Sequence, residues 1–415
     1  MRTRTFSPRI LPLLVAWFSA CACSAGLADE GGFLTRLHSV TEQSGVTFRG
    51  EYTGEGLGNL TGGIRRGATY EALIKLGVQL DLKPILGWTG ATLSATALYP
   101  FGEGLSREYT GDFNILSNID AYDSFRLFEF WFQQRFFGGN ASFRIGQMAA
   151  DQEFYQSQRS NIFINSCFGT FPTISMGTSL PIYPVGGLGA RLDVHPSAGT
   201  FARVAVFDSN PGQANGNDRH GTRFNLSPGS GVLVIAEGGW QVVPSSDNGG
   251  RDETYTLGAY YDSRRFNGGF VHPAHAGNGG FYAIADRLLY RPTPYVNAQS
   301  KLTGLGGFAS IAAAPADRNE VSFYADTGLN YNGVFPGRDH DVFGLAVSYT
   351  RISRDYLIDR RPIHSGHEAV LEGTYRVQVT DHLYIQPDIQ YIFDPGAFRH
   401  LPNTLAAGVR FDLTF

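Results

Sequence analysis

Strict alternation of apolar and polar residues restricts the fold of this chain more than any other feature, and the C-terminus shows it most clearly. Apolar or aromatic side chains occupy every second position from Leu405 to Phe415, and polar or small residues fill the positions between them. Because the side chains of a strand point alternately to its two faces, the segment predicts a strand with one apolar and one wet face.

The same alternation recurs along the chain in runs of about 9–14 residues, the length of a tilted strand that crosses a bilayer. We predict sixteen such strands, and an even number is usual for bacterial single-chain barrels. The predicted strands are 46–53, 69–82, 88–99, 125–137, 141–148, 187–195, 200–208, 231–243, 253–266, 280–290, 300–313, 319–332, 341–353, 366–380, 382–394 and 404–415.

Composition helps to choose between membrane classes. Only 42% of the residues are hydrophobic and the mean hydropathy is −0.14, which excludes a helical membrane protein. The chain is nevertheless rich in glycine (52), phenylalanine (31) and tyrosine (20), as expected where aromatic residues form girdles at a membrane interface. A soluble sandwich would also alternate, but with its apolar face packed inward. We therefore predict an all-β fold, a 16-stranded antiparallel outer-membrane barrel with long external loops and short periplasmic turns.

The two ends of the chain support export to the outer membrane of a Gram-negative cell. Arg2, Arg4 and Arg9 precede a short apolar stretch and a small-residue exit at Ala28, which predicts a cleaved secretory signal. The terminal Phe415 resembles the signal by which the barrel-assembly machinery recognises its clients. The expected units are a signal peptide at 1–28, a periplasmic lead-in at 29–45 and a barrel at 46–415.

Charge and cysteine content exclude several functions. The chain has 33 basic and 37 acidic residues, and the predicted signal removes three arginines, so nucleic acid is not an expected partner. Cys21 and Cys23 leave with the signal, so Cys167 alone remains. An intrachain disulfide and a cysteine-based metal site are therefore excluded.

The connections also alternate in length. Long or Gly/Asn-rich connections follow odd-numbered strands, at 54–68, 100–124, 149–186, 209–230 and 267–279. With both termini in the periplasm, these connections would be external. A loop as long as 149–186 is usually functional or disordered, and our first hypothesis is that it folds inward and narrows the pore. A solvated external loop is the alternative.

Six stretches of the chain resemble the carbohydrate-selective porins of the OprB family. They are 127–134 (LFEFWFQQ), 144–147 (RIGQ), 163–169 (FINSCFG), 181–184 (PIYP), 368–375 (EAVLEGTY) and 386–396 (QPDIQYIFDPG). The resemblance implies a sixteen-stranded outer-membrane barrel for the passive diffusion of small sugars such as glucose. The resemblance is weaker over residues 209–340. The expected assembly is a monomer or a homotrimer in outer-membrane lipid.

The segment 125–137 contains the most specific candidate site. Phe128, Phe130, Phe132 and Phe136 share the parity expected to face lipid. The opposite parity presents a carboxylate, an indole, an amide and a guanidinium to the lumen, which suits a ring of hydroxyls with apolar C–H faces. These residues are Glu129, Trp131, Gln133 and Arg135. Ordinary lumen lining with charges paired across strands is the alternative.

Further lumenal candidates come from other segments. Arg144, Gln147, Asn165 and Arg191 complete the predicted substrate-binding set. More distant candidates are Asp193, Arg203, Glu237, Tyr324, Asp326, Glu372, Arg376, Asp388 and Arg410.

No catalytic residue, metal or cofactor is expected. A glycine pattern at 304–309 has no phosphate-binding helix after it, and the pairs His272/His275 and His364/His367 have no evident third ligand. The alternatives to a sugar porin are a general porin, one selective for organic acids or polyols, and a barrel enzyme or structural envelope protein.

Overall fold

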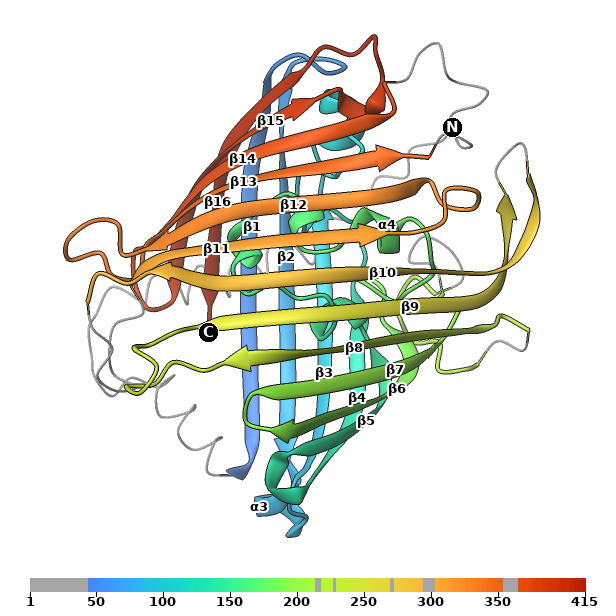
Figure 1. Cartoon of the computed structure of the whole chain (residues 1–415), viewed down its shortest axis with the longest axis vertical. Helices are drawn as coiled ribbons and strands as arrows, with labels where there is room; N and C mark the ends of the chain where they lie inside the picture. The colour runs from blue at the N-terminus through green and yellow to red at the C-terminus, as the bar shows by residue number, and fades with distance from the viewer. Residues whose placement is uncertain (1–43, 213–217, 227–228, 269–271, 294–302, 354–364) are drawn as a thin grey trace, which may run out of the picture.

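The computed structural model describes residues 44–415 except 213–217, 227–228, 269–271, 294–302 and 354–364. In this part of the chain sixteen strands form one closed antiparallel barrel, in which β1 pairs with both β2 and β16 (Figure 1). The strands are β1 (Val46–Thr61), β2 (Gly67–Asp81), β3 (Ala91–Gly102), β4 (Arg126–Phe136), β5 (Ala141–Met148), β6 (Gly187–Ser197), β7 (Thr200–Asp208), β8 (Val232–Val242), β9 (Glu253–Gly268), β10 (His272–Tyr290), β11 (Gly304–Ala313), β12 (Val321–Asn332), β13 (Val342–Ile352), β14 (His367–Gln378), β15 (Leu383–Phe393) and β16 (Thr404–Thr414).

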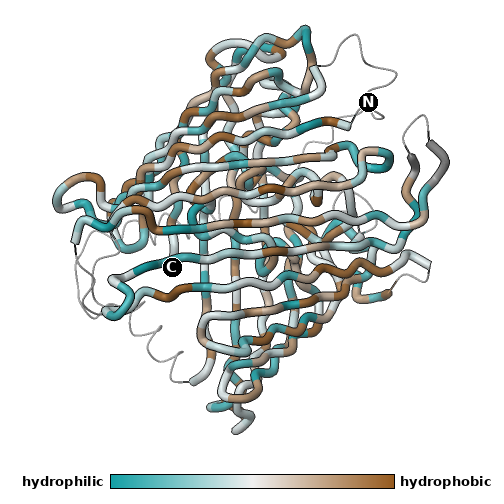
Figure 2. Tube along the Cα trace, viewed as in Figure 1, coloured by the Kyte–Doolittle hydropathy of each residue, from teal (hydrophilic) through white to brown (hydrophobic). Residues whose placement is uncertain are grey.

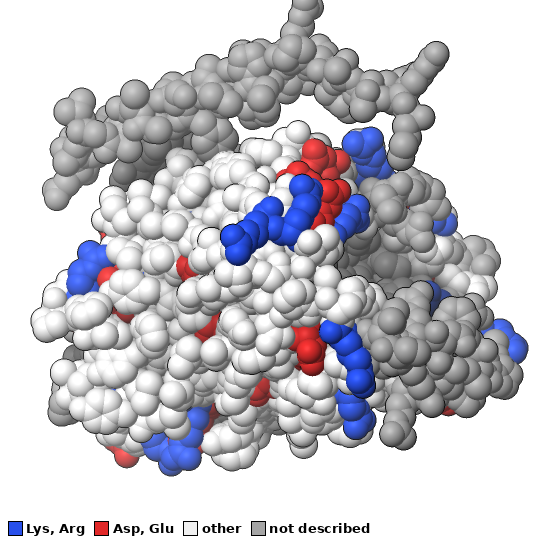
Figure 3. Space-filling view, turned by 90° about the horizontal axis from the view of Figure 1, so that it is seen from above, with Lys and Arg blue, Asp and Glu red and all other residues white. Residues whose placement is uncertain are grey.

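Alternation along the strands produces an apolar outer wall and an inner wall that carries both polar and buried apolar side chains. In β13, Leu345 and Val347 are exposed on the outer face, whereas the alternate residues Ala346 and Ser348 are buried inside the barrel. Figure 2 shows apolar and polar positions alternating along the strands. In the view of Figure 3, charged side chains form separate patches between broad uncharged areas. No helix in the described residues is long and apolar enough to cross a membrane.

Two strands are longer than the alternation predicted. β1 continues to Thr61, so most of the expected connection 54–68 belongs to the sheet, and β10 begins at His272 inside the expected connection 267–279. Glycines conceal the pattern in β1. A Cβ on Gly54 would lie 2.5 Å from the Tyr70 hydroxyl and 2.7 Å from the Phe411 ring, so this position takes no side chain beneath its aromatic neighbours.

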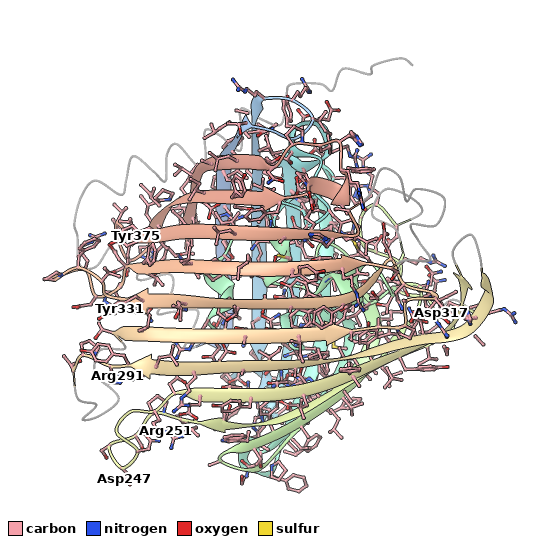
Figure 4. The ribbon with its side chains drawn as sticks, turned by 45° about the horizontal axis from the view of Figure 1, so that its top comes forward. Asp247, Arg251, Arg291, Asp317, Tyr331 and Tyr375 are labelled. Carbon is pink, nitrogen blue, oxygen red and sulfur yellow. The ribbon has the colours of Figure 1, made fainter. Side chains whose placement is uncertain are left out.

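The connections give the barrel two different ends. Short connections at 137–140, 198–199 and 379–382, together with helix α3 (Leu82–Leu86), lie at what we name the turn end. The long connections 103–125, 149–186 and 209–231 leave the opposite loop end. Figure 4 shows Arg251 and Arg291 at the turn end and Asp317 at the loop end. The predicted signal and nearly all of the lead-in lie outside the described residues.

Two long connections fold into the barrel. Loop A (103–125) contains η1 (Ser106–Thr110) and loop B (149–186) contains η3 (Ala150–Gln152), η4 (Ser160–Ile162), η5 (Ser166–Phe168) and α4 (Pro172–Ser175). Phe171 of loop B packs against Tyr282 and Tyr324 of the wall, with ring centroids 5.8 and 5.5 Å apart. The hypothesis of an inward loop is therefore confirmed for 149–186, and the solvated-loop alternative is wrong.

Candidate solute-binding site in the lumen

Carboxylates of the barrel wall hold both loops by their main-chain amides. Glu368 accepts hydrogen bonds from the amides of Phe113 and Asn114 in loop A, both at 2.7 Å. Glu372 accepts those of Ile164 and Asn165 in loop B, at 2.5 and 3.0 Å. A buried carboxylate is costly unless its oxygens are hydrogen-bonded, so these contacts fix each loop at a defined place.

The same arrangement recurs further along loop B. Glu237 accepts from the Tyr155 amide at 2.9 Å, and Asp286 accepts from the Ser157 hydroxyl at 2.7 Å and the Arg159 amide at 3.2 Å. Sequence reasoning had assigned no role to Asp286 or Glu368. One signal in the sequence could have suggested a role. Both acids occupy strand positions that point into the lumen, where a long connection could reach them.

Alternating guanidinium and carboxylate groups form a continuous ladder from β5 to β8. Arg144 and Arg191 both pair with Glu153 of loop B, with 2.5 Å between Arg191 Nε and Glu153 Oε2. Arg203 pairs with Asp193 at 3.7 Å and with Glu237 at 3.4 Å. We name this set the arginine–carboxylate ladder; its members are Arg144, Glu153, Arg191, Asp193, Arg203 and Glu237.

The ladder combines charge balance with partial exposure. Three guanidinium groups face three carboxylates, so it has no net formal charge. The side chains of Arg144, Glu153, Asp193 and Arg203 remain 15, 17, 18 and 22% exposed, whereas Arg191 and Glu237 are almost fully buried. Four members can therefore contact a solute, and two act as buried supports.

Four residues of the predicted set meet at the ladder. The Arg144 guanidinium lies 3.7 Å from the centroid of the Trp131 ring. Gln133 Oε1 accepts hydrogen bonds from Arg144 Nη2 at 2.8 Å and Arg191 Nη2 at 3.0 Å. The structure therefore brings Trp131, Gln133, Arg144 and Arg191 together, and their role in binding a solute stays a prediction. The predicted set did not include Glu153, the loop residue that connects the two arginines.

Two other predicted residues position loop B. Glu129 accepts a hydrogen bond from the Ala149 amide, where the loop leaves β5, at 3.1 Å. Asn165 is fully buried and donates to the Asn114 carbonyl and to Gln390 Oε1, at 3.2 and 3.0 Å. These side chains stabilise the loops that bound the solute path.

Gln147 bonds to the main chain of neighbouring segments. Its amide donates to the carbonyls of Leu127, Phe128 and Gly221, at 2.9, 3.2 and 3.0 Å, and the side chain is buried. It pairs in register with Phe130, whose ring is exposed on the outer face. These contacts attach the connection 209–231 to β4, and the predicted role of Gln147 as a ligand stays untested.

Arg135 keeps the predicted parity, because it pairs in register with Ser142, whose hydroxyl bonds to Arg191. Its side chain is exposed near the turn end, its amide donates to the Gly90 carbonyl at 2.9 Å, and its role as a ligand stays a prediction. Phe128 was expected to face lipid but is buried against Leu98 and Tyr183. The register shift between β3 and β4 inserts one extra residue there, which turns the ring inward.

Loop B carries one acid that titrates near neutrality. Burial raises the pKa of Asp151 from its ordinary value of 3.8 to about 6, and hydrogen bonding from the Tyr183 amide opposes part of that rise. The amide nitrogen lies 2.8 Å from Asp151 Oδ2, so the carboxyl group joins the start of loop B to its end.

The remaining motifs show no site chemistry. Gly304 and its neighbours lie in β11, as expected for strand glycines. Within the described residues, no group of three or more His, Cys, Asp or Glu side chains could hold a metal ion. His364 lies outside these residues.

Comparisons with known proteins agree with this architecture. Porin B of Pseudomonas aeruginosa is 25% identical over 94% of this chain and 91% of its own, and the putative porin QuiX of Acinetobacter baylyi is 24% identical over 94% and 92%. The structure titled "High pH structure of Pseudomonas putida OprB" matches 92% of this chain and 97% of its own with a TM-score of 0.82 at 24% identity. Its low-pH counterpart matches 93% and 98% with a TM-score of 0.60 at 20% identity.

These structures support the fold, and a family model supports the wider assignment. The model for the carbohydrate-selective porins of the OprB family matches residues 65–415. The relatives are channels of the outer membrane rather than enzymes. The chain therefore belongs to the OprB family of carbohydrate-selective outer-membrane porins.

Proposed function

We propose that this porin mediates passive, selective diffusion of neutral monosaccharides such as glucose, which bind transiently at the arginine–carboxylate ladder. The charge balance of the ladder is the observation that supports this most strongly. Each sugar hydroxyl donates and accepts, and the ladder offers donors and acceptors within 4.0 Å of one another.

The ladder is also suited to weak binding. Its groups already pair with one another, so a solute exchanges hydrogen bonds with them instead of meeting bare charges, and a pore solute must leave as easily as it enters. Trp131 lies directly behind Arg144 and keeps the guanidinium plane in a fixed orientation. A neutral ring of hydroxyls fits this arrangement better than an ion does.

The alternative is a general porin, or one selective for organic acids or polyols, on the same barrel. A channel selective for organic acids needs an excess of positive charge along its path. The equal numbers of arginines and carboxylates in the ladder favour the neutral sugar.

Glucose titration of single-channel current tests the proposal. We expect reversible block in the wild-type channel and an increase of about tenfold in the half-blocking concentration for Arg144→Gln, since one charge-assisted donor is lost. Arg338→Gln is the matched control, because Arg338 is exposed and lies in the turn-end connection 333–341. A wild-type channel that glucose never blocks, or equal shifts in both variants, would reject the proposal.

A further inference from the structure

A cavity separate from the arginine–carboxylate ladder lies at the turn end of the barrel, against residues 158–162 of loop B. Its volume is about 300 Å³, at the small end of the range for ligand pockets. Loop B contributes Gln158, Arg159 and Asn161. Two turn-end connections contribute Asp252 and Arg291, and strand β14 contributes Arg376. None of these residues belongs to the arginine–carboxylate ladder.

This cavity differs from the ladder in charge. Three guanidinium groups line it against one carboxylate. Arg159 Nη2 pairs with Asp252 at 3.0 Å, and Arg291 Nη2 donates to the Gly250 carbonyl at 3.0 Å. Among the lining residues guanidinium groups therefore outnumber carboxylates in a partly enclosed space, where electrostatic attraction is stronger than in bulk water.

Arg376 is the clearest recognition group. Its guanidinium carbon lies 4.1 Å from the centroid of the Tyr384 ring, which supports the planar group on one side. Its Nε is buried and has no hydrogen-bond partner among the described residues. A planar guanidinium that is supported on one face is suited to a carboxylate, which can bind its two terminal Nη atoms with parallel hydrogen bonds.

The tip of loop B supplies groups for hydroxyls. Gln158 and Asn161 are exposed there, and each carboxamide can donate and accept. A ligand with one carboxylate and several hydroxyls would thus use both walls of the cavity. A simple carboxylate would use only the arginine side.

We propose that the turn-end cavity is a second solute station, which binds hydroxylated carboxylates of the sugar-acid class. This goes beyond the proposed diffusion of neutral sugars, because it adds a solute class and a separate set of residues. The ladder discriminates by charge balance and the cavity by excess positive charge.

The experiment measures block of single-channel current by D-gluconate, with acetate and glucose as comparison solutes. In the wild type we expect gluconate to block at lower concentration than acetate, because acetate lacks the hydroxyls. Arg376→Gln should raise the half-blocking concentration of gluconate about tenfold and leave that of glucose unchanged. Arg291→Gln provides a second variant if Arg376→Gln does not assemble, and a smaller shift in the same direction is expected.

Arg251→Gln is the matched control, since Arg251 is exposed at the same end and lies outside the cavity lining. The proposal is overturned if acetate blocks as well as gluconate, if Arg251→Gln shifts gluconate block as far as Arg376→Gln, or if Arg376→Gln shifts glucose block equally. If gluconate blocks the wild-type channel but glucose does not, only the proposal for the ladder is rejected.

Discussion

Two sets of residues in loop B contact the barrel wall in different ways. Near its start, Glu153 joins two arginines of the wall in a partly exposed ion-pair ladder. Further along, Phe163, Phe168 and Phe171 enter a buried cluster with wall aromatics. The aromatic contact is non-directional and fixes the loop, whereas the ion pairs leave polar groups at the solute path. One loop therefore both packs against the wall and supplies a carboxylate to the arginine–carboxylate ladder.

Removal of an aromatic side chain from loop B should have the largest effect on how firmly the loop is held in the lumen. Phe171→Ala leaves a cavity between Tyr155, Tyr282 and Tyr324, and such a substitution typically costs about 3–5 kcal/mol. We expect loop B to leave the lumen, so that the open-channel conductance increases and glucose block is lost.

Alkylation of Cys167 reports the same release. The thiol is buried in loop B, and burial raises its pKa, so it should resist iodoacetamide in the wild type and react in Phe171→Ala. Phe137→Ala is the control, because that ring is exposed at the turn end. An unreactive thiol and unchanged conductance in Phe171→Ala would show that the cluster does not hold the loop.

A change of pH should have an intermediate effect on the stability of the polar contacts of loop B. The pKa of Asp151 is raised in the folded state from 3.8 to about 6, so the folded protein binds the proton more tightly. Closure of loop B should therefore be most stable below about pH 4, weaken as pH rises toward 6 and stay constant above it. The full shift corresponds to at most ~3 kcal/mol.

Hydrogen exchange of the loop B amides between pH 4 and 7, corrected for the intrinsic rate, measures this closure. Asp151→Asn keeps an acceptor for the Tyr183 amide but cannot ionise, so its protection should no longer depend on pH in this range. Equal pH dependence in both proteins would assign the effect to another group.

Unbalancing the ladder should have the smallest energetic effect but a clear change of selectivity. Glu153→Gln removes one carboxylate shared by Arg144 and Arg191. We expect anion preference in the reversal potential across a KCl gradient and a glucose half-blocking concentration about tenfold higher, or ~1.4 kcal/mol. Glu108→Gln is the control, because Glu108 pairs with Arg65 on the exposed surface. Unchanged ion selectivity would show that the ladder does not lie on the conduction path.

The alternation of residue types along the chain was enough to predict the wall of the barrel. Side chains of a strand alternate with a period of two, and lipid outside and water inside impose opposite chemistry on the two faces. All sixteen strands were therefore recognisable, including β13 and β16, and Trp131, Gln133, Arg144 and Arg191 were placed correctly on the inner face. The same rule failed for Phe128, because the inserted residue in β4 changes the parity and leaves no local mark.

The segments that occupy the lumen became known only from the tertiary structure. Loops A and B have no periodicity, and their positions depend on hydrogen bonds from their amides to carboxylates far away in the chain, such as Glu368 and Glu372. Glu153 reaches Arg191 only after loop B has folded inward, and Gln147 meets Gly221 only when two connections share one end of the barrel. Contacts between residues so distant in sequence follow from closure of the barrel, which no local pattern encodes.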